Sequence, residues 1–398
     1  MSAHLSQSGI PRRAQTLPDL WFSLGFRALA YQILVIGAVV AGAVWLIGNA
    51  QDALARLGIS TGFSFLHERA GFDIGETPIA FRSTDSFLRA YAVGFLNTIK
   101  VSAAGIFLAT LIGVLIGLAR LSSNALIRAL ASSYIELFRN TPQLLQLIFW
   151  YALITRLPVP QQAYSVWDAA FISNRGLILP WPIDAETVAR VLLAVATGFV
   201  CVVTLRIWAN SHHRRTGRHV ATDTAGTALL IIAPLAVWAA SGAPTAFSVP
   251  ELRGFNFAGG LTISPEFLAL MLALALYIAA FIAEIVRSGI RSVPSAQLEA
   301  ARAIGLRPWH RYSRIVLPQA LRVMIPPATA QYVSLIKNSS LGVAIGYPEL
   351  FNINNSIITL SGRAVEAIAI MMAIYLSISL VVGLLMTLYN RSVRIVER

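Results

Sequence analysis

Eight long apolar segments occur along the 398-residue chain, and they constrain its fold more than any other feature. A helix needs about 20 consecutive apolar residues to cross the hydrocarbon core of a bilayer. We therefore expect eight membrane-spanning helices, at Ala28–Ile47, Leu88–Ala119, Tyr134–Leu153, Val188–Trp208, Ala225–Ser241, Glu266–Val286, Leu321–Ala344 and Ala364–Tyr389. The segment that begins at Ala225 is the weakest, because it is short and contains Pro234. The sequence predicts an all-α, polytopic membrane protein.

The low content of charged residues supports contact with a lipid bilayer. Charged residues make up 12% of the chain, about half the share that is usual in soluble proteins. The net charge of +13 would suit nucleic acid, but the arginines flank apolar segments and do not gather with aromatic residues on a soluble region. We therefore expect no nucleic-acid partner. The single cysteine, Cys201, lies inside an apolar segment, so no disulfide or cysteine metal site is expected.

The distribution of arginine predicts the orientation in the membrane. Cytoplasmic loops of membrane proteins carry an excess of Lys and Arg. With eight spans and a cytoplasmic N-terminus, 19 arginines fall on the cytoplasmic side and eight on the opposite side. We therefore expect both termini in the cytoplasm.

A polar segment rich in arginine, 299–318, separates two of the apolar segments. Residues 295–304 are expected to form a helix about 15 Å long, roughly half the length that a spanning helix requires. Gly305 should end this helix, because glycine adopts the left-handed conformation readily, and Leu306 should fold back on the alanines of the helix. The small apolar face of such a helix would let another protein approach its backbone closely.

The spacing within this segment resembles a known family sequence. Glu-Ala-Ala begins at 299, a glycine follows at 305, and Ile-x-Leu-Pro occupies 315–318. This spacing resembles the EAA loop of the permease subunits of bacterial ABC importers, in which the loop forms a coupling helix that contacts a cytoplasmic ATPase. The resemblance implies the following ATPase-coupling residues: Glu299, Ala300, Ala301, Gly305 and Leu306. The alternative is an ordinary surface helix.

The resemblance also divides the chain. Residues 88–157 and 261–390 resemble the five-span core of polar amino-acid permeases, and the extra spans resemble the long form found in general L-amino-acid permease subunits of Gram-negative bacteria. It implies a type I ABC importer transmembrane fold of about eight transmembrane helices with a five-helix core. The expected parts are an N-terminal tail, first span and periplasmic region (1–87), the first core part (88–157), a periplasmic segment with an inserted two-span hairpin (158–260), the second core part (261–390) and a cytoplasmic tail (391–398).

Polar clusters interrupt three of the apolar segments, at 97–100, 139–146 and 331–340. Polar groups at membrane depth are costly and usually face the bundle interior or a watery cavity. Amides can offer a donor and an acceptor to an amino-acid zwitterion, so broad amino-acid selectivity is our hypothesis. The substrate-path candidates are Asn97, Thr98, Lys100, Asn140, Gln143, Gln331, Ser334, Lys337 and Asn338. The alternative is hydrogen bonding between helices, which we favour for any single Ser or Thr.

Two of these clusters resemble family sequences but depart from them. Residues 136–142 resemble E-x-x-R-G-T-P, with Asn140 where glycine is usual. Residues 337–341 resemble K-D-T-S-L, with Asn338 where aspartate is common. The second departure removes a charge beside Lys337 and leaves the pairing of that lysine open.

The sequence lacks the motifs of an ATPase and of a zinc protease. The only lysines, Lys100 and Lys337, do not occur in a G-x-x-x-x-G-K-[ST] phosphate-binding loop, and H-E-x-x-H is absent. We expect no catalytic residue, no metal and no cofactor, with ATP hydrolysed on a separate chain.

The sequence as a whole predicts a permease subunit of an ATP-driven amino-acid importer in the bacterial inner membrane. The expected partners are a cytoplasmic ATPase, a second permease subunit that forms a heterodimer with this chain, and a periplasmic amino-acid-binding protein. Two alternatives stay open at this point: a secondary transporter and a membrane-embedded enzyme, each of unrelated fold.

Overall fold

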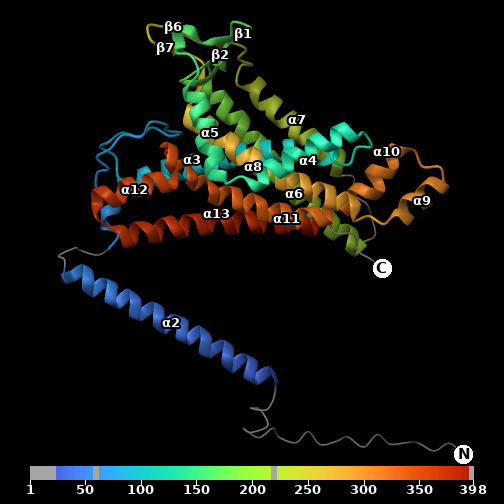
Figure 1. The fold of residues 1–398 in the computed structure, drawn as a ribbon, viewed down its shortest axis with the longest axis horizontal. Helices are drawn as coiled ribbons and strands as arrows, with labels where there is room; N and C mark the ends of the chain where they lie inside the picture. The colour runs from blue at the N-terminus through green and yellow to red at the C-terminus, as the bar shows by residue number, and fades with distance from the viewer. Residues whose placement is uncertain (1–23, 57–61, 217–221, 394–398) are drawn as a thin grey trace, which may run out of the picture. The chain divides into compact units, whose positions relative to one another are not determined.

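The computed structural model describes residues 24–56, 62–216 and 222–393 (Figure 1). The chain forms two compact units, Met1–Phe63 and Ser64–Arg398, which we describe separately. In the first unit, helix α2 spans Leu24–Arg56. Its segment Arg27–Leu46 is long and apolar enough to cross a membrane, and its side chains are almost all exposed within the unit. This helix matches the first predicted span.

The second unit consists mainly of helices. They are η1 (Ser64–His67), α3 (Phe87–Ala119), α4 (Ala125–Asn140), α5 (Gln143–Thr155), η2 (Pro160–Gln162), α6 (Ala185–Thr216), α7 (Thr222–Ala240), α8 (Pro265–Arg291), α9 (Ser295–Ala303), α10 (Pro308–Arg311), the π-helical turn η3 (Tyr312–Val316), α11 (Leu317–Asn338), η4 (Ser339–Ile345), α12 (Leu350–Ser361) and α13 (Ala364–Val393).

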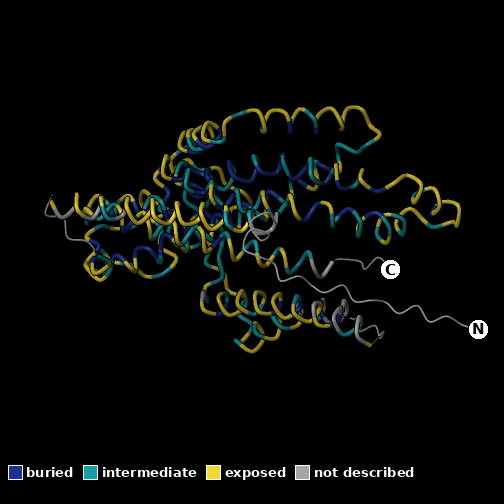
Figure 2. Tube along the Cα trace, turned by 90° about the horizontal axis from the view of Figure 1, so that it is seen from below, coloured by how far each residue is buried: buried dark blue, intermediate teal, exposed yellow. Residues whose placement is uncertain are grey.

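Helix α8 lies at the centre of the second unit and packs against α3, α4, α5 and α11. Small residues allow the close approach of α3, because side chains of α8 occupy the space where larger residues would be. A Cβ atom added at Gly113 would lie 2.6 Å from Cβ of Ile282, and one added at Gly117 would lie 2.8 Å from Cβ of Val286. A Gly-x-x-x-Gly spacing of this kind is typical of helix contacts in membranes. Figure 2 shows the buried positions gathered inside this helix bundle.

Short antiparallel strands, which the sequence analysis did not predict, lie at one end of the second unit (Figure 1). One sheet has the order β1 (Tyr164–Val166), β2 (Ala170–Ser173), β3 (Gly176–Leu179) and β8 (Leu261–Ile263); the strand pairs are β4 (Trp181–Pro182) with β5 (Phe247–Ser248), and β6 (Glu251–Arg253) with β7 (Asn256–Ala258). Strand β3 precedes α6 and its neighbour β8 follows α7, with Ile178 paired to Thr262. The chain thus leaves one sheet before the α6–α7 hairpin and returns to the same sheet after it.

Five of the eight predicted spans are helices that are long and apolar enough to cross a membrane, among the residues that the structure describes. The third predicted span is different, because the chain extends at Thr141 (φ −101°, ψ 133°) and Pro142 follows, which divides the segment into α4 and α5. The fifth is the short apolar helix Gly226–Ala240. The seventh consists of α11, which carries Arg322 and Lys337, and the 3₁₀ turn η4.

Candidate functional site

The loop between α8 and α11 contains the short helix that the sequence predicted. Helix α9 spans Ser295–Ala303 and ends at Gly305, which has a φ of +73°. The amide of Gly305 donates to the carbonyl of Arg302 at 2.9 Å, and the amide of Leu306 donates to the carbonyl of Ala301 at 3.1 Å. This pair of bonds is the Schellman arrangement, which needs a left-handed residue at the helix end. The predicted role of Gly305 in ending the helix is confirmed.

Two large apolar side chains are exposed on the outer surface of this polar loop. Ile304 is 75% exposed and Trp309 is 76% exposed. Of the five predicted coupling residues, Glu299, Ala300 and Gly305 are exposed and Leu306 is half-buried. Ala301 is 2% exposed, so in this structure it packs against the rest of the protein and is not accessible to a partner. Exposed apolar patches rimmed by polar residues are typical of surfaces that bind another protein.

A direct contact connects this loop to α11. The side-chain amide of Gln319 donates to Oε1 of Gln297 at 2.6 Å and to the carbonyl of Ile315 at 3.0 Å. Gln297 belongs to α9, and Gln319 lies in the first turn of α11. Helix α11 also carries Gln331 and the residues up to Asn338, so this contact joins α9 to the helix that holds the third polar cluster.

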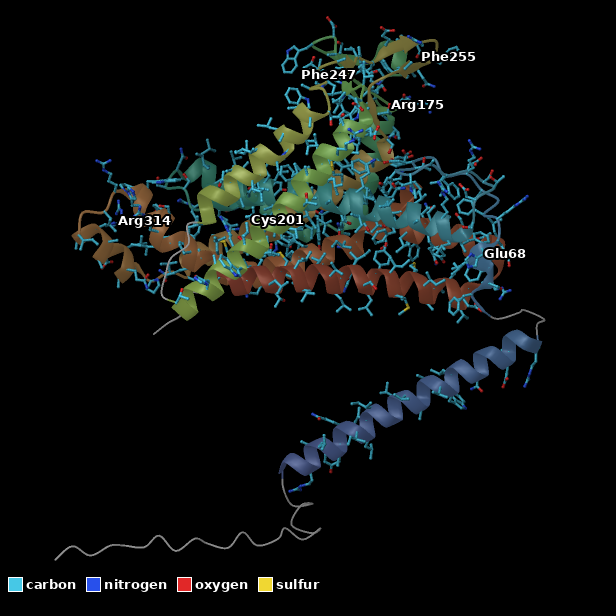
Figure 3. The ribbon with its side chains drawn as sticks, turned by 180° about the vertical axis from the view of Figure 1, so that it is seen from behind. Glu68, Arg175, Cys201, Phe247, Phe255 and Arg314 are labelled. Atoms are coloured by element: carbon cyan, nitrogen blue, oxygen red, sulfur yellow. The ribbon has the colours of Figure 1, made fainter. Side chains whose placement is uncertain are left out.

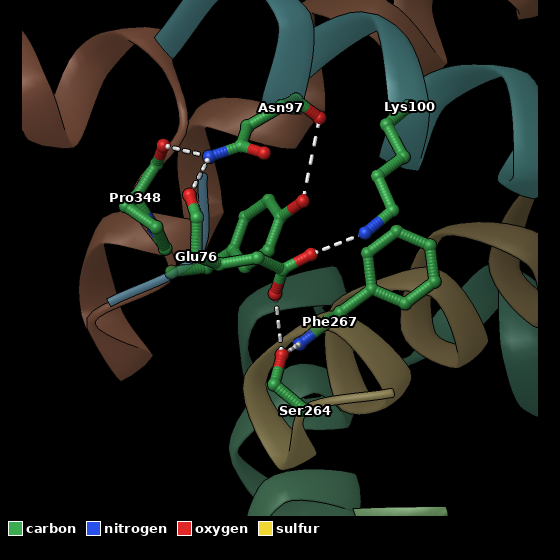
Figure 4. A network of polar contacts seen from close by, with 7 residues as sticks. Glu76, Asn97, Lys100, Ser264, Phe267 and Pro348 are labelled. Atoms are coloured by element: carbon green, nitrogen blue, oxygen red, sulfur yellow. Dashed lines mark hydrogen bonds and ion pairs between the residues drawn. The ribbon is translucent and has the colours of Figure 1, made fainter. Parts of the chain in front are cut away.

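The first polar cluster is part of a network that joins distant segments (Figure 4). The amide nitrogen of Asn97 donates to the carbonyls of Glu76 at 2.8 Å and Pro348 at 2.9 Å. The Glu76 carboxylate accepts from Lys100 at 2.5 Å and from the Ser264 hydroxyl at 2.7 Å. Figure 4 shows Asn97 and Lys100 converging on Glu76 from α3. The network therefore joins three parts of the chain: the segment before α3, the start of α8 and the turn before α12.

Two of the predicted path residues are fully buried in this structure and bond to other parts of the chain. Asn97 and Thr98 are each 0% exposed. The Thr98 hydroxyl accepts from the amide of Leu350 at 3.1 Å, which fastens α3 to the start of α12. Lys100 differs from them, because its side chain is 48% exposed and its ammonium lies 4.8 Å from the centre of the Phe267 ring.

The second and third clusters meet at the break between α4 and α5. The side-chain amide of Asn338 donates to Oε1 of Gln143 at 2.7 Å, and the amide nitrogen of Gln143 is buried without a partner. Gln146 donates to the carbonyls of Phe138 and Thr141 at 3.0 and 3.1 Å, which satisfies carbonyls that the break leaves free. The sequence analysis predicted both clusters but not their contact.

The other predicted path residues differ in exposure. Gln331 and Ser334 are half-buried on α11, whereas Asn140 and Lys337 are exposed. The resemblance left the pairing of Lys337 open, and no ion pair of this lysine occurs among the described residues.

The sequence analysis missed the role of two carboxylates. Glu76 is at the centre of the first network, and Glu349 is 0% exposed. The Glu349 carboxylate caps α12 by accepting from the amides of Phe351 and Asn352 at 2.9 and 2.8 Å, and it accepts from the Tyr375 hydroxyl at 2.7 Å. Its place just before an apolar helix is the only sequence signal for this cap, and glutamate is not among the favoured capping residues. A polar pocket of about 360 Å³ lies beside the network and includes Glu76 and Glu266.

Within the described ranges, no group of three or more His, Cys, Asp or Glu residues is placed to hold a metal ion. The fold and the site therefore define a helical membrane protein that exposes a short helix in the loop before α11 and carries polar clusters in its apolar segments.

Comparison with known proteins identifies the family. The family model described as "Binding-protein-dependent transport system inner membrane component" matches residues 109–397, so this chain belongs to that family. The chain is a membrane-spanning permease subunit and not an enzyme, because in this family the ATPase is a separate component. The prediction of a permease subunit in the membrane is confirmed, and the family implies an ATPase and a second permease as partners.

Three curated relatives cover almost the whole chain. The chain is 46% identical over 374 residues to the putative amino-acid ABC transporter permease protein YhdX of Escherichia coli, with 94% of this chain and 95% of the relative covered. It is 43% identical to the general L-amino acid transport system permease protein AapQ of Rhizobium johnstonii, with 94% of each covered. It is 37% identical over 420 aligned positions to the glutamate/glutamine/aspartate/asparagine transport system permease protein BztB of Rhodobacter capsulatus, with 98% of each covered.

Proposed function

We propose that this chain is the permease subunit of an ATP-driven importer whose substrates are amino acids. The observation that carries the proposal is the near full-length identity of 43–46% to two relatives named as amino-acid permeases. A third relative is named for two acidic amino acids and their amides. Broad selectivity among amino acids fits a path built from amide side chains, which can donate and accept at once.

The proposed mechanism is alternating access driven through α11. A periplasmic binding protein delivers the amino acid, this chain and a different second permease form the path, and two ATPases move the α9 helices when they close on ATP. The Gln297–Gln319 contact supports this coupling, because it joins α9 to the helix that carries Gln331 and Asn338. The Asn338–Gln143 bond lies at the other end of α11, where it links that helix to α5.

The test is ATP-dependent uptake by the reconstituted complex against a panel of labelled amino acids. We expect uptake of several amino acids, with loss of all of it when the binding protein is omitted. Uptake that continues without ATP, or that is driven by an ion gradient, would contradict the proposal and favour a secondary transporter.

The proposed orientation places both termini and α9 in the cytoplasm and the strands in the periplasm. Figure 3 supports this arrangement, since Phe255 of the strand region and Arg314 of the coupling loop lie at different ends of the second unit. In a Cys201→Ser background, cysteines at Asp73 and Phe255, which are both exposed, should react with an impermeant thiol reagent in intact cells. A cysteine at Ser211 should react only after the cells are opened, and its labelling in intact cells would overturn the orientation.

The Gln331→Leu variant tests the substrate path. Loss of a hydrogen bond to substrate is expected to lower uptake about tenfold, since an unmet polar contact costs about 1–3 kcal/mol. The amount of assembled complex should not change, because Gln331 is only half-buried. Gln161→Leu, which changes an exposed glutamine outside the bundle, is the control. A complex that falls apart would assign Gln331 to helix packing, and unchanged uptake would remove it from the path.

A further inference from the structure

A basic pocket of about 380 Å³ lies where α3 ends, α4 begins and α8 ends. Its lining residues are Arg120, Ala125, Arg128, Ala129, Ser132, Arg287 and Arg291. Four arginines from three helices thus surround one space, and none of them belongs to the predicted coupling loop helix or to the polar clusters of the path.

The charges in this pocket are only partly offset. The Glu284 carboxylate lies 3.4 Å from the guanidinium of Arg120 and accepts from Nε of Arg287 at 3.0 Å. Arg128 donates to the carbonyl of Ser122 at 3.1 Å, and neither Arg128 nor Arg291 has a carboxylate within ion-pair distance in the described part of the chain. Four guanidinium groups face one carboxylate, which leaves an excess of three positive charges.

The pocket lies at the end of two apolar helices. The spans Phe87–Ala119 and Pro265–Arg291 both end here, with Arg120 directly after the first and Arg291 in the last turn of the second. Arginines at this position lie at the depth of lipid headgroups.

Helix α4 adds an apolar surface beside the arginines. Residues 125, 128, 129 and 132 share the helix face that lines the pocket. The adjacent face carries Leu126, Leu130 and Leu137, which are 68%, 63% and 64% exposed. Exposed leucines next to a cationic pocket are complementary to a molecule that has an anionic headgroup and apolar chains.

We propose that this pocket binds the phosphate headgroup of an anionic phospholipid, with the acyl chains lying along Leu126, Leu130 and Leu137. Arginine binds phosphate oxygens through charge-assisted hydrogen bonds with fixed geometry. Basic pockets between helices at a membrane surface are suited to anionic headgroups. A free phosphate ion would meet the same arginines but would leave the leucines uncovered.

The test is native mass spectrometry of the purified complex in neutral detergent, titrated with phosphatidylglycerol and with phosphatidylcholine of the same acyl chains. We expect a preference for phosphatidylglycerol. The double variant Arg128→Gln, Arg291→Gln should lower the affinity for phosphatidylglycerol about thirtyfold and abolish the preference. These two arginines are chosen because they have no carboxylate partner, so their loss leaves the Glu284 contacts in place.

Three further arms separate the alternatives. Arg128→Lys with Arg291→Lys keeps the charge and should retain most of the affinity, whereas Arg156→Gln removes an exposed arginine outside the pocket and should leave the affinity unchanged. Leu126→Asn with Leu130→Asn should weaken phosphatidylglycerol binding several-fold. Inorganic phosphate should not displace the lipid at equal concentration.

The proposal is overturned if the Arg→Gln double variant keeps the preference for phosphatidylglycerol. It is also overturned if inorganic phosphate competes fully while the leucine variants have no effect, which would define a soluble-anion site. Loss of the ATPase from the double variant with lipid binding intact would assign the arginines to a protein contact.

Discussion

Replacing Gly305 with valine is expected to lower ATP-dependent uptake about tenfold per assembled permease and to weaken retention of the ATPase during purification. The cause is the backbone, because Gly305 has a φ of +73° and no atom lies within 4 Å of an added Cβ. A β-branched residue in this left-handed region costs about 1–3 kcal/mol. The chain relieves that strain by opening the end of α9, which displaces the exposed surface around Ile304.

Two matched variants make this result specific. Gly305→Asn should retain most uptake, because asparagine tolerates the left-handed region. Gly362→Val places the same strain in open space at the end of α12, where φ is +68°, and should leave ATPase retention unchanged. Normal uptake and normal ATPase retention by Gly305→Val would contradict the assignment of this loop to coupling.

The end of α9 could be predicted from the sequence because helix ends depend on neighbouring residues. A glycine after a short polar helix ends that helix through local hydrogen bonds. The amides of Gly305 and Leu306 bond to carbonyls only three and five residues earlier in the chain. The inward position of Ala301 could not be predicted in the same way. Which alanine of a small apolar face is covered depends on the surrounding loop and α11, which are arranged by tertiary contacts.

The break in the third predicted span shows a different limit. One helix was predicted over 134–153 from the apolar residues on either side of the polar cluster 139–146, although Pro142 is itself a sequence signal for a break. The extended backbone at Thr141 and the capping of free carbonyls by Gln146 depend on local geometry that hydropathy does not measure. The strands were missed for a related reason, since segments of two to four residues are too short for an alternating pattern.

The polar clusters were found by sequence, but their roles depend on partners far along the chain. Asn97 bonds to Pro348, 251 residues away, and Gln143 bonds to Asn338, 195 residues away. A polar side chain at membrane depth is expected to have a polar partner, but the sequence does not show whether that partner is substrate or backbone. Burial helps to separate the two cases: it favours a packing role for Asn97, whereas half-buried Gln331 stays a path candidate.

Asn97→Leu should therefore lower stability more than it lowers transport by the molecules that fold. Leucine has a similar volume, but it removes the donor for the carbonyls of Glu76 and Pro348. Each carbonyl that loses its partner in this part-buried site costs about 1–3 kcal/mol, so the two together should cost roughly 2–6 kcal/mol. The measurement is the fraction of monodisperse protein that survives heating in detergent, together with uptake normalised to the folded complex.

Asn355→Leu is the matched control, because it makes the same substitution at an exposed position on α12. It should leave the melting temperature unchanged. Glu76→Gln separates the contacts of the network further, since it removes the carboxylate that binds Lys100 and keeps the backbone carbonyl that accepts from Asn97. If Asn97→Leu melts at the same temperature as the parent protein and yet loses uptake, then Asn97 contacts substrate in another conformation of the cycle, and its burial describes only one state of the path.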